Sequence, residues 1–123
     1  MPLKTLVKVG NISNLSDARY CSGMGVEMLG FRVIEGQQNF VSPKLFQEIR
    51  GWVTGPKIVA EIYGLTSPDQ LPSILENYAP DYFEIDAAAF SILSDQLALP
   101  CIVSGFISTD AKIVYQILDE REA

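Results

Sequence analysis

Five short apolar runs, separated by segments with helical spacing, constrain the fold of this chain more than any other feature of its sequence. They lie at residues 6–9, 28–34, 57–63, 82–86 and 101–104. Each run is almost continuously apolar instead of alternating with polar side chains. That pattern is typical of parallel strands covered by helices. The sequence therefore predicts a parallel sheet built from five strand–helix units.

The segments between these runs carry apolar stripes with helical spacing and clear helix boundaries. The stripes are Leu45, Phe46, Ile49 and Trp52; Leu71, Ile74, Leu75 and Tyr78; Phe90, Leu93 and Leu97; and Val114, Ile117 and Leu118. Capping residues stand at Asn14, at Ser42 and Ser67 before prolines, and at 108–110. Gly23 and Gly25 end the first helix, whose apolar face we expect to hold Leu15, Ala18, Cys21 and Met24. These stripes are predicted to pack in the core, Trp52 included.

Five such units raise a question of topology. Right-handed crossovers that all advance in one direction place every helix on one face of the sheet. An eight-unit barrel closes on its other face, but it needs at least about 200 residues. The chain has 123 residues, predicted to form a single domain over 1–123. The expected fold is thus a parallel (βα)5 half-barrel, related to the (βα)8 TIM barrel. The alternative is a doubly wound, flavodoxin-like sheet with a reversed strand order.

Composition and charge exclude several classes of function. The net charge of −6 is the wrong sign for binding nucleic acid or an anionic membrane surface, and no apolar run is long enough to span a bilayer. The chain has no histidine, which excludes Ser-His-Asp and Cys-His catalysis. Cys21 and Cys101 lack metal-ligand spacing and are predicted to be reduced, which favours the cytoplasm. We expect neither a metal nor a cofactor.

Several stretches resemble one enzyme family. Residues 8–18, KVGNISNLSDA, resemble the opening of the phosphoribosylanthranilate isomerases, whose first strand reads Lys-Ile-Cys-Gly-Ile-Thr and is followed by Asn-Leu-x-Asp-Ala. Residues 25–31, GVEMLGF, are similar to the Gly-Ala-Asp-x-Leu-Gly-Phe of the second strand, and residues 40–43, FVSP, to a Tyr-Val-Ser-Pro helix entry. The family consists of (βα)8 barrels of tryptophan biosynthesis. The resemblance runs from about Leu6 to Ile107 and implies the first half of such a barrel.

The chain departs from the family at the positions that carry its chemistry. The resemblance places the cysteine that serves as general base at Gly10, followed by Asn11. The arginine before Tyr-Val-Ser-Pro becomes Asn39, and the Gln and His of the fourth strand become Glu84 and Asp86. The family's general acid lies on the sixth strand and its phosphate site after the seventh and eighth, beyond the fifth unit. The resemblance therefore predicts a relative that lacks both proton-transfer groups, each worth typically about 10²–10⁴-fold in rate.

Charged side chains inside the apolar strands form the candidate site. They are Lys8, Arg32, Glu61, Glu84 and Asp86, and we add Asn11 at the end of the first strand. Burying such charges unpaired costs several kcal/mol each. One interpretation is a polar pocket at the carboxyl ends of the strands, where paired carboxylates bind a cation or a basic ligand. The other is a structural network, in which Lys8 and Arg32 neutralise Glu84 and Glu61.

A half-barrel leaves the face opposite its helices uncovered. We expect apolar residues such as Leu6 and Ile62 on that concave face, and therefore a homodimer that buries it. The functional expectation is a shortened relative of phosphoribosylanthranilate isomerase without isomerase activity, acting as a small-molecule binding or structural protein. The alternative is an active isomerase assembled as an oligomer.

Overall fold

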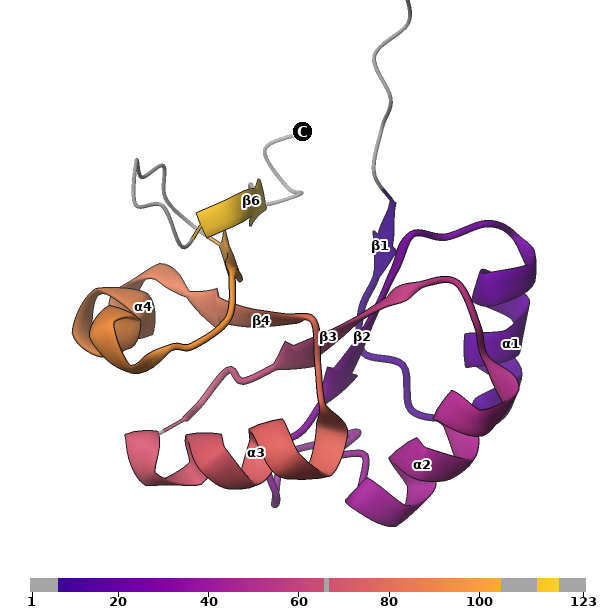
Figure 1. The fold of residues 1–123 in the computed structure, drawn as a ribbon, viewed down its shortest axis with the longest axis horizontal. Helices are drawn as coiled ribbons and strands as arrows, with labels where there is room; N and C mark the ends of the chain where they lie inside the picture. Colours follow the sequence, from indigo (N-terminus) through magenta and orange to yellow (C-terminus); the bar gives the residue numbers. More distant parts are fainter. Residues whose placement is uncertain (1–6, 66, 105–112, 118–123) are drawn as a thin grey trace, which may run out of the picture.

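The computed structural model describes residues 7–65, 67–104 and 113–117, and in these ranges the chain forms one curled parallel sheet with helices outside it. The elements are β1 (Lys8–Val9), α1 (Leu15–Gly23), β2 (Met28–Arg32), α2 (Pro43–Trp52), β3 (Lys57–Glu61), the 3-10 turn η1 (Pro68–Gln70), α3 (Leu71–Tyr78), β4 (Tyr82–Asp86), α4 (Ala87–Leu93), the 3-10 turn η2 (Ser94–Gln96), β5 (Cys101–Ser104) and β6 (Ile113–Ile117). Figure 1 shows α1 to α4 ranged around the outer side of the curve.

The strand order confirms the half-barrel. The strands lie side by side in chain order from β1 to β6, and every neighbouring pair is parallel. The order never reverses, so the doubly wound alternative is wrong. Unidirectional right-handed crossovers place all helices on the convex face, as in a barrel that has not closed.

The segment predicted as a last helix is a strand in the structure. Residues 113–117 form β6, which pairs with β5 through a register shift between Cys101 and Ile102. The apolar spacing of Val114 and Ile117 fits a helix, but the run Ile-Val-Tyr-Gln-Ile is rich in β-branched and aromatic residues, which favour a strand. The capping residues expected at 108–110 lie outside the described residues.

Local capping chemistry fixes where the other helices begin. Asn14 Oδ1 accepts a hydrogen bond from Asp17 N at 2.8 Å at the start of α1. Ser42 Oγ accepts from Leu45 N at 3.2 Å at the start of α2. Ser67 caps η1, which leads directly into α3. Gly25, with a φ of +81°, reverses the chain after α1, a left-handed conformation that glycine adopts without strain. These four boundaries were all predicted.

The main core lies between the sheet and its helices. Strand residues alternate faces, so Leu29 and Phe31 of β2 point to the helices while Met28 and Arg32 point to the concave side. Phe46 of α2 packs edge-to-face on Phe31 at 5.1 Å and on Tyr78 of α3 at 5.2 Å between ring centroids. The rings thus join β2, α2 and α3 in one packed unit.

Tyr78 carries a buried hydroxyl in this core. Its Oη donates to the carbonyl oxygen of Val41 at 2.6 Å. Burial, with a smaller contribution from the Glu35 carboxylate, raises the pKa of Tyr78 from 10.0 to about 12. The phenol is therefore protonated in the folded chain well above neutral pH.

The apolar residues of the concave face differ from those expected. Ile62 packs in the helix-side core, and Leu6 lies outside the described residues. The concave face instead carries Met28, Val59 and Ile102, which form a second small cluster with Tyr82. All three side chains are at most 5% exposed. The curl of the sheet thus buries them within a single chain.

Two residues predicted to pack in the core are exposed instead. Trp52 ends α2 and Met24 caps the end of α1, and about two thirds of each side chain is exposed. The buried side of α2 continues from Ile49 to Val53, which lies four residues further on. Trp52, three residues after Ile49, is turned toward solvent instead. Cys21 is half-buried against the core, as predicted, and Cys101 is buried. No helix in the described residues is long and apolar enough to cross a membrane.

Candidate functional site

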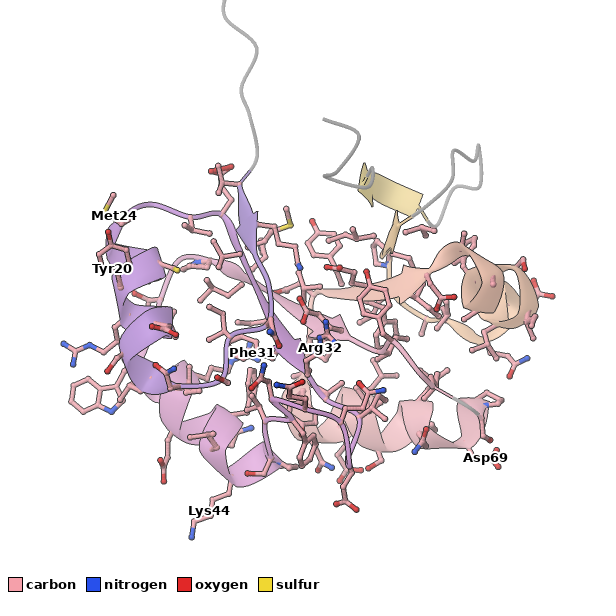
Figure 2. The ribbon with its side chains drawn as sticks, turned by 180° about the vertical axis from the view of Figure 1, so that it is seen from behind. Tyr20, Met24, Phe31, Arg32, Lys44 and Asp69 are labelled. Carbon is pink, nitrogen blue, oxygen red and sulfur yellow. The ribbon has the colours of Figure 1, made fainter. Side chains whose placement is uncertain are left out.

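Four of the candidate residues meet on the concave face of the sheet. Three of them lie side by side in one row across the sheet: Arg32 on β2, Glu61 on β3 and Glu84 on β4. Arg32 pairs in register with Glu61, and Glu61 pairs with Glu84. Lys8 projects from β1 on the same side. Figure 2 shows Arg32 inside the curve of the sheet, near the middle of the molecule.

Lys8 links the two carboxylates. Its Nζ lies 2.7 Å from Glu61 Oε2 and 2.5 Å from Glu84 Oε1. Arg32 Nε donates to Glu61 Oε1 at 3.1 Å. Glu61 is 2% exposed and Glu84 6%, so both carboxylates are buried and each needs a compensating charge. Two cations and two anions balance within one chain, which is the structural network considered above.

Tyr63, which sequence reasoning missed, closes this network into a ring. Its hydroxyl donates to Glu84 Oε2 at 2.5 Å, and the Arg32 guanidinium carbon lies 5.4 Å from the centre of its aromatic ring. Tyr63 stands two residues after Glu61, so the two-residue period of a strand was the signal that could have placed it on this face. We call Lys8, Glu61, Arg32, Tyr63 and Glu84 the concave ring.

Two glycines make room for the concave ring. A Cβ built on Gly30 would clash with Glu61 Oε2 and lie 2.9 Å from Lys8 Cε. A Cβ on Gly10 would meet Glu61 Oε2 and Lys8 Nζ, which fill the space beside it. Neither glycine has a positive φ, so space alone requires them. The position to which the resemblance assigned a base is thus occupied by an ion pair.

Asn11 joins the ring through its backbone. Its N–H donates to Glu61 Oε1 at 3.1 Å and to Oε2 at 3.2 Å. Asn11 has a φ of +59° and Asn39 a φ of +63°, a left-handed conformation that asparagine tolerates better than most residues. Asn39 Nδ2 donates to Asn11 Oδ1 at 3.3 Å. This contact ties the end of β1 to the segment that precedes α2.

Asp86 does not enter the concave ring. Its Oδ2 accepts a hydrogen bond from Ala89 N at 3.3 Å, so it caps α4, which begins at the next residue. Glu84 and Asp86 therefore have different partners, and the structure does not bring them together as a carboxylate pair. Among the described residues, no group of three or more acidic or cysteine side chains is placed to hold a metal ion.

The ring fixes what its groups can do chemically. Three donors reach Glu61: Lys8 Nζ at Oε2, Arg32 Nε at Oε1, and the Asn11 N–H, which both oxygens share. Both oxygens of the carboxylate are thus engaged by charged or backbone donors. Arg32 is one third exposed and, in the described part of the chain, uses only its Nε as a donor. Its two terminal nitrogens are the donors left for a ligand.

A separate groove of about 390 Å³ lies outside the curve of the sheet. It runs between the segment after β2 and helices η1 and α3, with Val33, Phe40, Ile74 and Tyr78 along it and Glu35 and Asp69 beside them. None of the six candidate residues lines it. The groove therefore has no connection with the concave ring.

Comparison with models of protein families gives no match, and comparison with curated protein sequences gives none. Solved structures do match the fold. Monomers of the dimeric phosphoribosylanthranilate isomerase from Thermotoga maritima align with 89% of this chain and 56% of theirs, at a TM-score of 0.65 and 14% identity. The isomerase from Thermus thermophilus aligns with 87% of this chain and 55% of its own, at a TM-score of 0.67 and 17% identity.

A third solved structure is a phosphoribosylanthranilate isomerase in complex with reduced 1-(o-carboxyphenylamino)-1-deoxyribulose 5-phosphate. It aligns with 89% of this chain and 57% of its own, at a TM-score of 0.66 and 15% identity. The chain thus spans a little over half the length of these enzymes. At such low identities, the likeness establishes a shared fold.

Proposed function

We propose that this chain is a half-barrel relative of phosphoribosylanthranilate isomerase that does not catalyse the isomerisation and that works as a binding or structural unit, paired as a homodimer. The observation that carries the proposal is the concave ring. Lys8 and Glu61 fill the space beside Gly10, the position that the resemblance assigns to the general base.

Glu61, the most buried carboxylate of the ring, is not free to serve as a substitute base. A general base needs an acceptor site turned toward the substrate's proton. Both oxygens of Glu61 are engaged by Lys8, Arg32 and the shared N–H of Asn11. Freeing Glu61 would break its ion pairs with Lys8 and Arg32 and leave a buried carboxylate uncompensated, which is costly. The same side chains that stabilise the fold are therefore withdrawn from proton transfer.

A binding role rests on Arg32. Its side chain is one third exposed, and its two terminal nitrogens form a fork that matches the two oxygens of a carboxylate. They stand near the carboxyl ends of β2 and β3, where parallel sheets with helices on their faces bind ligands. We assign a small carboxylate as the class of ligand that this geometry fits, and Arg32→Lys is expected to weaken its binding because lysine lacks the fork.

The homodimer follows from the incomplete barrel. The sheet ends at β1 on one side and at β6 on the other in the described residues, and a barrel removes such edges only by closing. One structural neighbour is a monomer generated from an isomerase that is itself dimeric. Both cysteines are thiols, in keeping with a reducing compartment, and we therefore assign the protein to the cytoplasm.

Complementation tests the proposal in cells. A tryptophan auxotroph that lacks phosphoribosylanthranilate isomerase is transformed with this chain, and no growth without tryptophan is expected. A full-length isomerase such as the one from Thermus thermophilus serves as the positive control. Growth that depends on Glu84 or Asp86 would overturn the proposal and would favour the active, oligomeric isomerase.

A further inference from the structure

The groove on the outer side of the sheet has the size of a small-molecule site. Its volume of about 390 Å³ falls within the range of roughly 300–1,000 Å³ that such sites occupy. It lies between the segment that follows β2 and the helical segment formed by η1 and α3. The groove therefore has room for one small organic molecule.

The apolar wall of the groove is already built in the free chain. Val33, Ile74 and Tyr78 line it and are at most 5% exposed, so the core holds their side chains in place. Tyr78 is further fixed by its hydrogen bond to the Val41 carbonyl and by its edge-to-face contact with Phe46. A wall that is formed in advance lowers the ordering cost of binding, and it favours a ligand with an apolar body.

The charge on the groove has one sign. Glu35 and Asp69 line it, whereas no lysine or arginine among the described residues does. Both residues are exposed, and neither carboxylate takes part in an ion pair within the described ranges. Glu35 also contributes to the raised pKa of Tyr78, so its negative charge acts on the buried wall of the groove. A ligand that complements this charge is a cation.

The two cations of α2 are directed elsewhere. Arg50 Nη1 donates to the carbonyl oxygens of Tyr78 and Ala79, at 2.9 and 3.2 Å, at the C-terminal end of α3. Lys44 lies at the start of α2, and Figure 2 shows its side chain pointing away from the molecule, far from Asp69. The acidic side chains of the groove are therefore left to a cation from outside the described part of the chain.

The groove also offers hydrogen-bond acceptors that suit an ammonium group. An ammonium group has three N–H donors and no acceptor. Besides the two carboxylates, Ser73 and Asn77 line the groove. Asn77 Nδ2 donates to Ser73 Oγ at 3.2 Å, which leaves the amide oxygen of Asn77 to accept. A primary ammonium can donate to several of these oxygens at once.

We propose that this groove binds a small primary amine in its ammonium form. Its apolar ring or chain lies against Ile74 and Tyr78, and its ammonium group lies at the acidic rim formed by Glu35 and Asp69. The site goes beyond the proposed function, which concerns a carboxylate at Arg32. No residue of the concave ring lines the groove, so the two proposals stand or fall separately.

Three probes of similar size and different charge test the proposal: phenethylammonium, phenethyl alcohol and phenylacetate. Each is titrated into the isotope-labelled chain at neutral pH, and the backbone amide signals are followed by NMR. We expect phenethylammonium to shift the amide signals of Glu35, Asp69 and Ile74. It should bind about fivefold more tightly than the alcohol, the contribution of about one exposed ion pair.

Phenylacetate should leave the groove signals in place. Shifts that it causes around Arg32 report on the carboxylate site of the proposed function, so the two sites are tested apart. Equal binding of the ammonium and the alcohol would overturn the amine site. So would the absence of groove shifts with about 10 mM phenethylammonium, ten times the dissociation constant of about 1 mM expected for so small a ligand.

A double variant removes the charge of the rim and keeps its shape. In Glu35→Gln combined with Asp69→Asn, phenethylammonium should bind no more tightly than phenethyl alcohol, whose own binding stays unchanged. Glu48→Gln is the matched control, because Glu48 is an exposed carboxylate of α2 that does not line the groove. It should keep the fivefold preference. A double variant that still prefers the ammonium shows that the acidic rim does not recognise the ligand, and the proposal then fails.

Discussion

Lys8 Nζ lies 2.7 Å from Glu61 Oε2 although strand β2 runs between the strands that carry them. The contact is possible because β2 presents Gly30, which has no side chain, at the point where the two meet. The same Nζ reaches Glu84 on β4. One lysine thus ties together β1, β3 and β4 across the concave face. We expect the stability of the half-barrel to depend on this contact.

Replacing Lys8 should lower the free energy of unfolding of the chain. In Lys8→Met, Glu84 loses its only ion-pair partner among the described residues and Glu61 loses one of two. We expect the free energy of unfolding to fall by about 3–5 kcal/mol, because a buried carboxylate is left uncompensated. Urea unfolding measures it. Lys44→Met, at an exposed position of α2, should change it by no more than about 0.5 kcal/mol.

A second variant separates the charge from the packing. Lys8→Met combined with Glu84→Gln removes the uncompensated charge and should recover part of the loss. If Lys8→Met alone unfolds at the wild-type urea concentration, the concave ring does not hold the sheet together.

Adding a single methyl group at Gly30 tests the packing of the ring. The Cβ in Gly30→Ala would clash with Glu61 and lie 2.9 Å from Lys8 Cε, so the ion pair must move apart. We expect a loss of about 1–3 kcal/mol, the usual cost of overpacking. Gly51→Ala is the control, because Gly51 lies in α2 and a Cβ built on it would meet open space, and alanine should stabilise that helix by up to about 1 kcal/mol. Equal effects at the two glycines would contradict this account.

Asp86 should behave as a helix cap. In Asp86→Ala the backbone N–H of Ala89 loses its acceptor at the start of α4, and we expect a loss of about 1 kcal/mol. Asp86→Asn should be close to the wild type, because asparagine caps a helix about as well as aspartate. Thermal unfolding followed by circular dichroism compares the three proteins. If Asp86→Asn destabilises the chain as much as Asp86→Ala does, the charge of Asp86 matters at this position and not its role as a cap.

The raised pKa of Tyr78 predicts how the stability of the chain depends on pH in the alkaline range. Its folded pKa of about 12 is higher than the unfolded value of 10.0. Between these values the unfolded chain loses a proton that the folded chain keeps, so stability falls as pH rises, by up to about 1.4 kcal/mol per pH unit. Below about pH 10 the tyrosine contributes no slope.

Tyr78→Phe isolates this contribution. The variant lacks the hydrogen bond to the Val41 carbonyl and should be less stable than the wild type by about 1 kcal/mol at neutral pH. Urea unfolding between pH 8 and pH 11.5 should show the two stabilities converging above about pH 10 and crossing before the upper end of this range. A difference that stays constant over this range would mean that the hydroxyl ionises in the folded chain as it does in the unfolded one.

Local chemistry explains why much of the fold could be predicted. Asn14, Ser42 and Ser67 cap their helices through contacts that span only a few residues, so the sequence alone reveals them. The residues 113–117 were assigned to a helix, because apolar positions three apart fit a helix while the β-branched composition fits a strand. Pairing with β5 decides between them, and no local pattern records that pairing.

The sequence identified the charged residues of the site but not how they contact one another. Mutual neutralisation of Lys8, Arg32, Glu61 and Glu84 was one of two interpretations, since buried charges need partners, and a binding pocket was the other. Tyr63 was missed, since a tyrosine in a strand reads as packing until its hydroxyl is seen on Glu84. Met24 and Trp52 were placed in the core, because the last turn of a helix can face either way and only the docked structure shows which.

The most direct test of the central claim is a steady-state assay of the purified chain with phosphoribosylanthranilate. We expect no turnover above the uncatalysed rate, because the space beside Gly10 holds the Lys8–Glu61 pair and both oxygens of Glu61 are engaged by donors. Gly10→Cys, which restores the thiol, should be inactive too, since its side chain must displace that pair. Turnover by the wild type, abolished by Glu84→Gln or Asp86→Asn, would contradict the account.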